Sequence, residues 1–306
     1  MSTSGGTRAI LAALAANLGI AVTKFVAFLL TGSSAMLAES VHSVADSGNQ
    51  VLLIVGGRRA SRRADTEHPF GYGQVRYYYA FLVAIVLFTL GGLFALFEAW
   101  EKFHDPHPIE GPWWWVPLAV LGAAIVMEGL SLRTAMREAT PHRGSQGWWR
   151  FIRTSRSPEL PVVLLEDSGA IVGLLFALVG VSMTLVTGDG RWDAVGSAAI
   201  GLLLVVIAVV LARETQSLLL GEAATPEHIT AIRTALVGDG VDSVIHLRTM
   251  HLGPEELLVA AKIAVPAAST AAEVADAIDA AEARVRAAVP LSRLIYLEPD
   301  LRRRTP

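Results

Sequence analysis

Residues 160–186 read LPVVLLEDSGAIVGLLFALVGVSMTLV, and Glu166 and Asp167 are the only charged side chains in this stretch. A helix rises about 1.5 Å per residue, so roughly 20 apolar residues cross the ~30 Å hydrocarbon core of a membrane. The stretch is long enough to do this. Because it is continuously apolar rather than alternating, it predicts a transmembrane helix and not a barrel strand.

Further apolar stretches of similar length lie on both sides of it. The composition agrees, since 53% of the 306 residues are hydrophobic and only 17% are charged, whereas soluble domains carry about a quarter of charged residues. The sequence therefore predicts a polytopic α-helical membrane protein with six transmembrane helices, at residues 8–30, 33–57, 77–100, 113–136, 160–186 and 193–213.

The character of the chain changes after Gly221. A Thr-Pro pair at 225–226 predicts the start of a helix that runs to about Leu236. Runs rich in Val, Ile and Leu at 243–250, 257–265 and 294–297 predict strands, and residues 270–288 predict a second helix. We therefore expect a membrane domain over residues 1–221 and a small α+β domain over residues 222–306.

Charge and composition exclude several classes of protein. A formal net charge of −3 gives no sign of nucleic-acid binding, and the absence of cysteine excludes disulfide scaffolds and thiolate metal sites. The first apolar stretch lacks the cleavage pattern of a signal peptide. Arginines concentrate in the loops at 58–76 and 133–156. By the positive-inside rule, both termini and the α+β domain are expected in the cytoplasm, with the helices in the cell (inner) membrane.

The second apolar stretch carries ionisable side chains that a membrane span rarely contains. Glu39, His42 and Asp46 stand at positions i, i+3 and i+7, so a helix presents them on one face. Imidazole nitrogen and carboxylate oxygen are ligands for zinc and other first-row divalent ions. A polar stripe that only bonds a neighbouring helix is the alternative, but two carboxylates and a histidine exceed what helix adhesion requires.

The fifth stretch supplies a second set of ionisable groups, Glu166 and Asp167, about two turns from its start. Helix arithmetic brings them and the His42–Asp46 pair toward the middle of the bilayer. Uncompensated carboxylates at that depth are very costly, so we expect a metal or proton site between the second and fifth helices. Adjacent residues point about 100° apart, so Asp167 is the expected ligand and Glu166 the substitute or a proton carrier.

Three motifs together resemble the cation diffusion facilitator family: HSVAD at 42–46, DTEHPFGYG at 65–73 and the aspartate of the fifth stretch. The VIHLRT stretch at 244–249 resembles that family's cytoplasmic domain. The resemblance implies six spans, a cytoplasmic α+β (ferredoxin-like) domain, and a homodimer that exports Zn²⁺ or related divalent ions in exchange for protons. It implies that His42, Asp46 and Asp167 bind the transported ion.

The chain departs from the family pattern at Val163, where relatives usually carry His or Asp. Glu39, Glu166 or water would then complete the site. Replacing nitrogen by oxygen makes the site harder, which favours Mn²⁺, Fe²⁺ or Co²⁺ relative to Zn²⁺. Zinc stays the first expectation for the transported ion, and no organic cofactor is expected.

The resemblance also implies secondary metal sites, and the chain matches them only in part. Asp65 and His68 match two ligands of a loop site in some relatives, while Tyr72 replaces the third, a histidine. In the α+β domain His246 matches one ligand, Glu298 stands where an aspartate would be, and His251 is extra. We expect the domain mainly to dimerise.

Other functional classes fit the sequence less well. No HExxH and no GxSxG motif lies in any apolar stretch, so a membrane-embedded hydrolase is not expected and the protein is not predicted to be an enzyme. A metal sensor would bind ions without moving them, and a channel would move them without proton exchange. The sequence analysis favours a secondary transporter.

Overall fold

The computed structural model describes residues 3–109 and 111–301, with side chains from residue 17 onward. The chain divides into two compact units. The first contains the residues up to Gly56 together with Tyr78–Thr215, and the second contains Gly57–Tyr77 together with the residues from Gln216 onward. The loop after the second long helix therefore belongs to the same unit as the C-terminal residues.

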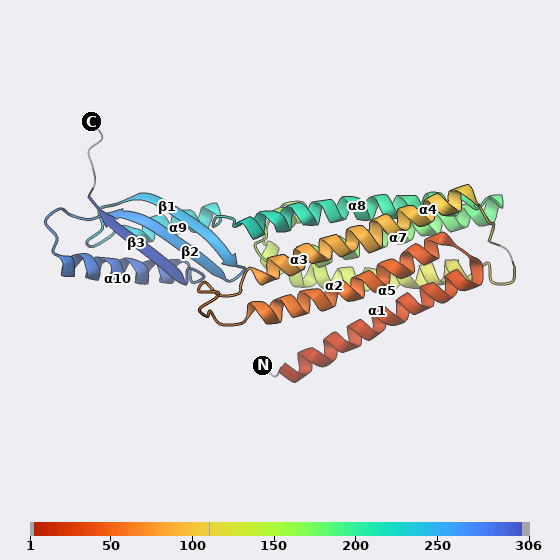
Figure 1. Cartoon of the computed structure of the whole chain (residues 1–306), viewed down its shortest axis with the longest axis horizontal. Helices are drawn as coiled ribbons and strands as arrows, with labels where there is room; N and C mark the ends of the chain where they lie inside the picture. The colour runs from red at the N-terminus through yellow and green to blue at the C-terminus, as the bar shows by residue number, and fades with distance from the viewer. Residues whose placement is uncertain (1–2, 110, 302–306) are drawn as a thin grey trace, which may run out of the picture. The chain divides into compact units, whose positions relative to one another are not determined.

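Long helices make up the first unit and run roughly along one direction, with α1 angled away from the others toward its N-terminal end (Figure 1). A short helix, α6, precedes the fifth long one. The third long helix is continuous but changes winding twice, so it carries three labels. The elements are α1 (Thr3–Thr31), α2 (Ser34–Ala60), α3 (Val75–Val86), η1 (Leu87–Leu93), α4 (Phe94–His104), α5 (Val116–Arg143), α6 (Trp148–Thr154), α7 (Glu159–Thr187) and α8 (Arg191–Leu220).

Four of these helices are long and apolar enough to cross a membrane: the α3–η1–α4 helix at Val75–His104, α5, α7 and α8. In α1 the apolar part within the described side chains, Asn17–Thr31, is shorter. These four helices coincide with four of the predicted spans and confirm a membrane protein with several apolar helices. Helix α2 is as long as the others but holds the polar groups Glu39, His42, Asp46 and Asn49 in its middle, which lowers its hydropathy.

The corner between α1 and α2 shows why the chain turns there. Gly32 adopts a left-handed φ of +64°, a conformation that glycine reaches without steric cost. The carboxylate of Asp193 on α8 then caps the start of α2, accepting hydrogen bonds from the Ser34 backbone N–H at 2.7 Å and from the Ser33 hydroxyl at 2.9 Å. A carboxylate at a helix N-terminus satisfies N–H groups that have no partner within the helix.

The third long helix winds as a π-helix over Leu87–Leu93 and packs closely against α8. A Cβ added at Gly92 would lie 2.7 Å from Val205 Cγ2, and one added at Gly201 would lie 2.9 Å from the Leu96 backbone nitrogen. Neither position accepts a side chain without movement. Small residues at such crossings let membrane helices approach backbone to backbone.

The second unit contains helices and a small sheet. Its elements are α9 (Pro226–Leu236), β1 (Ser243–Gly253), β2 (Glu256–Ala264), α10 (Ala271–Ala288) and β3 (Leu294–Asp300). Strand β2 lies in the middle of the sheet, antiparallel to β1 and parallel to β3. These elements confirm the predicted strands and helices, and the order α-β-β-α-β defines a small α+β region.

Local sequence explains where the two helices of this region begin. Thr225 caps α9 with Pro226 in the first turn, as predicted. Thr270 and Glu273 form a reciprocal capping box at the start of α10, which satisfies two N–H groups at once. The apolar faces of both helices pack on the sheet around the buried side chains of Ile232, Leu257 and Val285.

Candidate transport site

Two of the predicted ligands lie one helical turn apart on α2. His42 Nε2 is 3.5 Å from Asp46 Oδ2, and the His42 side chain is buried. Neither ring nitrogen of His42 forms a hydrogen bond with any described residue. A buried imidazole without hydrogen bonds keeps at least one nitrogen lone pair available for a ligand.

Helix α7 contributes Glu166 and Asp167, which reach different neighbours. Glu166 Oε1 accepts a 2.6 Å hydrogen bond from the Asn49 amide of α2. Asp167 Oδ2 instead accepts a 2.9 Å hydrogen bond from the Ser131 hydroxyl of α5.

These carboxyl groups surround a small cavity. Its volume is about 50 Å³, which is room for a few water molecules. Both Glu166 and Asp167 line it, where the sequence led us to expect only one of them to face the site. The remaining lining residues come from α1, α2, α5 and α7: Asn17, Ile20, Ser43, Asp46, Gln50, Glu128, Ser131 and Val163.

The predicted ligands have not converged on one point in this conformation. Among the described residues, no three His, Asp or Glu side chains are close enough together to hold a metal ion. His42 adjoins Asp46 but does not line the cavity. The structure therefore places Asp46, Glu166 and Asp167 around one cavity without joining them into a ligand cluster, and His42 contacts Asp46 from outside that cavity.

Glu39, the other candidate for the fourth ligand, is engaged elsewhere. Its Oε2 accepts a 2.9 Å hydrogen bond from Lys24 Nζ of α1, and the two side chains are 0% and 1% exposed. The same ammonium group donates to the Ser43 hydroxyl at 2.8 Å. The sequence analysis missed Lys24, although a lysine within an apolar stretch signals a functional or paired charge.

Glu128 on α5 is a second residue that the sequence analysis missed. It lines the cavity together with Asp46 and Asp167. The signal was again an acidic side chain within an apolar stretch. Asn49, which holds Glu166, gave no comparable signal, because an amide is tolerated at many helix contacts.

The 65–73 loop forms a compact turn around Asp65. The Tyr72 hydroxyl donates a 2.6 Å hydrogen bond to Asp65 Oδ2, and the backbone N–H of His68 donates to Oδ1 at 2.8 Å. The Tyr72 hydrogen bond is the main reason that the pKa of the Asp65 carboxyl is lowered, and it raises the pKa of Tyr72. Tyrosine thus takes the position beside Asp65 that the predicted third ligand would need.

The predicted ligands of the α+β region divide between two places. His246, Lys262 and Glu298 are direct partners across β1, β2 and β3. Lys262 Nζ pairs with Glu298 Oε1 at 3.0 Å and with Asp300 Oδ2 at 2.9 Å, and these carboxylates raise the pKa of the lysine. His251 is buried further along β1, with Nδ1 3.3 Å from the Gly253 carbonyl oxygen, and does not join this row.

Acidic side chains and a buried histidine lie among apolar helices in a membrane protein. The family model of the cation efflux transmembrane domain matches residues 10–220, a range that contains every residue of the cavity. The chain belongs to the cation diffusion facilitator family, a family of transporters of divalent metal ions, as its motifs predicted.

Named relatives cover most of the chain. It is 30% identical over 225 residues, 73% of its length, to the human protein called proton-coupled zinc antiporter SLC30A9, mitochondrial, and the match covers 39% of that protein. Metal tolerance protein C4 of Arabidopsis thaliana is 28% identical over 259 residues, 84% of this chain and 56% of the relative. Zinc transporter ZitB of Pectobacterium atrosepticum is 27% identical over 248 residues, which are 81% of this chain and 71% of the relative.

Proposed function

We propose that this protein is a secondary transporter that exports divalent metal cations, with Zn²⁺ as the first candidate, in exchange for protons. The observation that carries the proposal is the cavity between α1, α2, α5 and α7, which Asp46, Glu166 and Asp167 line among the apolar helices. Carboxyl groups at that depth need a cation or a proton, and the two alternatives are the two ions of an exchanger.

The position of Asp46, Glu166 and Asp167 around one cavity supports the exchange. Before a metal ion enters, protons on these carboxyl groups would offset the cost of burying their charges. An entering metal ion takes Asp46 and Asp167 as ligands and recruits the neighbouring His42, and the ligands must lose their protons to bind it. Protons arriving from the other side of the membrane then displace the ion. Alternating access between the two sides completes the cycle.

The wider assignment follows the family. We propose six membrane spans, both termini in the cytoplasm, a bacterial inner membrane as the location and a homodimer as the functional state. The arginines at 58–76 and 133–156 support the orientation. Because two relatives carry zinc in their names, zinc is the first candidate, whereas the oxygen-rich lining of the cavity supports Mn²⁺, Fe²⁺ or Co²⁺ as alternatives.

Metal flux in proteoliposomes tests the proposal, with wild type and Asp46→Ala compared in the same lipid. An inward-directed metal gradient and a lumen-acidic pH gradient should drive uptake, and metal addition should release protons from the lumen. Asp46→Ala should abolish both signals, and its folding is checked by an unchanged elution volume. Metal binding without flux would point to a sensor, and flux that ignores the pH gradient would point to a channel or uniporter.

A further inference from the structure

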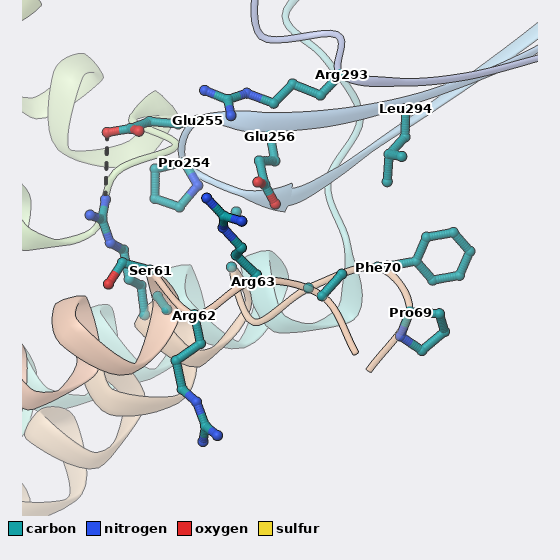
Figure 2. A pocket seen from close by; sticks show the side chains of 16 residues that line it. Ser61, Arg62, Arg63, Pro69, Phe70, Pro254, Glu255, Glu256, Arg293 and Leu294 are labelled. Atoms are coloured by element: carbon teal, nitrogen blue, oxygen red, sulfur yellow. Dashed lines mark ion pairs between the residues drawn. The ribbon is translucent and has the colours of Figure 1, made fainter. Parts of the chain in front are cut away.

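A second cavity, of about 440 Å³, lies within the second unit and shares no lining residue with the proposed transport site. One wall is the loop that follows α2, with Arg62, Arg63 and Phe70, and the other is the β1–β2 turn with Glu255 and Glu256, joined by Arg293 ahead of β3 (Figure 2). Its volume is that of a small-molecule site rather than of a packing defect.

Two glycines fix the walls of this cavity against each other. A Cβ added at Gly73 would lie 2.5 Å from the Leu252 carbonyl oxygen, and one added at Gly253 would lie 2.9 Å from Gly73 Cα. Real side chains essentially never tolerate such distances, so the loop and the turn touch backbone to backbone. The arginines of the loop are therefore held at a defined place beside the turn.

The charges in the cavity are not balanced. Four arginines line it, namely Arg62, Arg63, Arg76 and Arg293, against Glu255 and Glu256. Arg76 lies 4.0 Å from Glu255, and the Arg62 guanidinium lies over the Tyr72 ring at 5.0 Å. Within the described part of the chain, Arg63 and Arg293 form no ion pair closer than 4.0 Å.

We infer that this cavity binds a phosphate group that carries hydroxyl or ammonium donors, such as the headgroup of a glycerophospholipid. Guanidinium groups match phosphate oxygens with paired N–H donors, and Arg63 and Arg293 are the two that are uncommitted. Glu256, which points into the same space as Arg63 (Figure 2), accepts hydrogen bonds and therefore favours a phosphate with donors attached over a bare anion.

The position of this loop in the chain favours a lipid as the source of such a group. Helix α2 ends at Ala60, directly before the arginines of the loop, so the loop leaves the membrane domain within a few residues. Basic pockets next to membrane helices bind anionic lipid headgroups. A free phosphate ester offers the same chemistry, and the experiment has to separate the two sources.

The test uses the full-length protein, delipidated in detergent, and native mass spectrometry of added phosphatidylglycerol or phosphatidylcholine. Glycerol 3-phosphate and inorganic phosphate form the soluble arm, measured by calorimetry. Arg63→Gln/Arg293→Gln removes the two uncommitted guanidiniums, and Arg233→Gln/Arg248→Gln is the matched control, since it removes equal charge from exposed positions of the same unit outside the cavity.

Wild type should retain phosphatidylglycerol at least tenfold better than phosphatidylcholine, whose choline group offers no donors. The cavity variant should lose that preference and the control should keep it. If the cavity also binds glycerol 3-phosphate, the site is supported and its ligand can be a soluble phosphate ester. If it binds only the lipid, the site is supported and its ligand is a lipid. Equal retention of both lipids by wild type, or equal loss in cavity variant and control, would overturn the site.

Glu256→Gln keeps the test decisive if the double arginine variant folds poorly. Removing one negative charge should raise the retention of phosphatidic acid, whose phosphomonoester carries more negative charge and no glycerol headgroup hydroxyls, relative to phosphatidylglycerol. An unchanged ratio of the two lipids would contradict the proposed role of this cavity. None of these measurements depends on metal transport, so their outcome is independent of the function proposed above.

Discussion

At the residue scale, Val163 decides what kind of metal site the cavity makes. It lines the cavity one helical turn before Asp167, on the same side of α7, and supplies no donor atom. The remaining side-chain donors around the cavity are oxygens, apart from the amide nitrogens of Asn17 and Gln50, which bind no metal. Among the described side chains, His42 supplies an imidazole next to these oxygens, 3.5 Å from Asp46 Oδ2.

Val163→His should therefore shift selectivity toward zinc. The new imidazole would stand beside Asp167, and zinc prefers nitrogen ligands in a tetrahedral set, whereas manganese prefers oxygen. The gain should reach about 1–2 kcal/mol, a five- to thirty-fold rise in the ratio of zinc to manganese flux. Parallel flux measurements with each ion in proteoliposomes provide this ratio.

Glu166→Gln is the companion change. If Glu166 completes the native metal site, its loss should reduce flux in wild type and reduce it less in the Val163→His background, a non-additivity typical of residues that share a site. An unaltered zinc-to-manganese ratio in Val163→His together with normal flux in Glu166→Gln would leave a site of three residues and water.

Lys24 and Glu39 form an ion pair in which both side chains are buried. Removing one partner of such a pair leaves an uncompensated buried charge, which costs about 3–5 kcal/mol, whereas removing both is often neutral. We expect Lys24→Met to lower the yield and unfolding temperature sharply. The double variant Lys24→Met/Glu39→Gln should recover most of both, as followed by thermal unfolding in detergent.

The double variant also tests the role of Glu39. If Lys24 holds Glu39 away from the transported ion, the rescued double variant should transport metal near the wild-type rate. A stable double variant without flux would instead return Glu39 to the list of ligands. Failure of the second substitution to rescue stability would show that Lys24 does more than balance the Glu39 charge.

Single residues of the site differ in how far the sequence could predict them. The sequence could predict four of them, because an ionisable group in an apolar stretch is costly and the spacing places these groups on helix faces: His42, Asp46, Glu166 and Asp167. It could not predict the Lys24–Glu39 pair, since the spacing within one helix does not say which residue of another helix lies opposite. Glu128 carried the same signal as Asp46 and was overlooked.

At the scale of the elements, close helix contacts depend on glycine. The third long helix and α8 meet at Gly92 and Gly201, and a Cβ at Gly201 would lie 2.8 Å from Leu96 Cγ and 3.0 Å from the Gly92 carbonyl oxygen. Since two of its three neighbours are backbone atoms, rotating a side chain cannot relieve the contact. The helices would have to separate.

Gly201→Ala should therefore destabilise the membrane unit by about 1–3 kcal/mol, the range for overpacking. The matched control is Gly122→Ala on α5, where a Cβ meets nothing within 4 Å and alanine gains about 1 kcal/mol of helix propensity. Tryptophan fluorescence during thermal unfolding would compare the two. Equal unfolding temperatures for both variants would contradict this close packing of the third long helix on α8.

The elements themselves were largely predictable. Apolar length fixed the long helices, and Thr-Pro at 225–226 and Thr270 with Glu273 marked helix starts that the structure contains. The π-helical turn at Leu87–Leu93 was not predictable, because its apolar residues with two glycines fit α-helical and π-helical winding equally. The local sequence therefore does not decide the winding of this segment, whose Gly92 packs closely against Val205 of α8.

At the scale of the whole molecule, the sheet holds a fixed cation where relatives are expected to bind metal. His246, Lys262 and Glu298 form one row across three strands, and Lys262 pairs with both Glu298 and Asp300. An ammonium group in that place repels a divalent ion and neutralises the carboxylates that would otherwise bind it. We therefore expect the proposed dimer to need no metal.

The wild-type protein should remain dimeric in detergent after exhaustive chelation, as measured by light scattering coupled to gel filtration. Because the folded-state pKa of Lys262 is raised from 10.5, the ion pairs persist below that pH and weaken only as the pH rises through the raised value. The dimer should thus be unaffected by chelators in neutral and mildly alkaline buffers.

Lys262→His removes the cation and adds an imidazole between His246 and Glu298. The unfolding temperature of this variant, unlike that of the wild type, should therefore rise when zinc is added. Dissociation of the wild type on chelation would show that a metal does bind in this region, and a monomer under both conditions would contradict the homodimer.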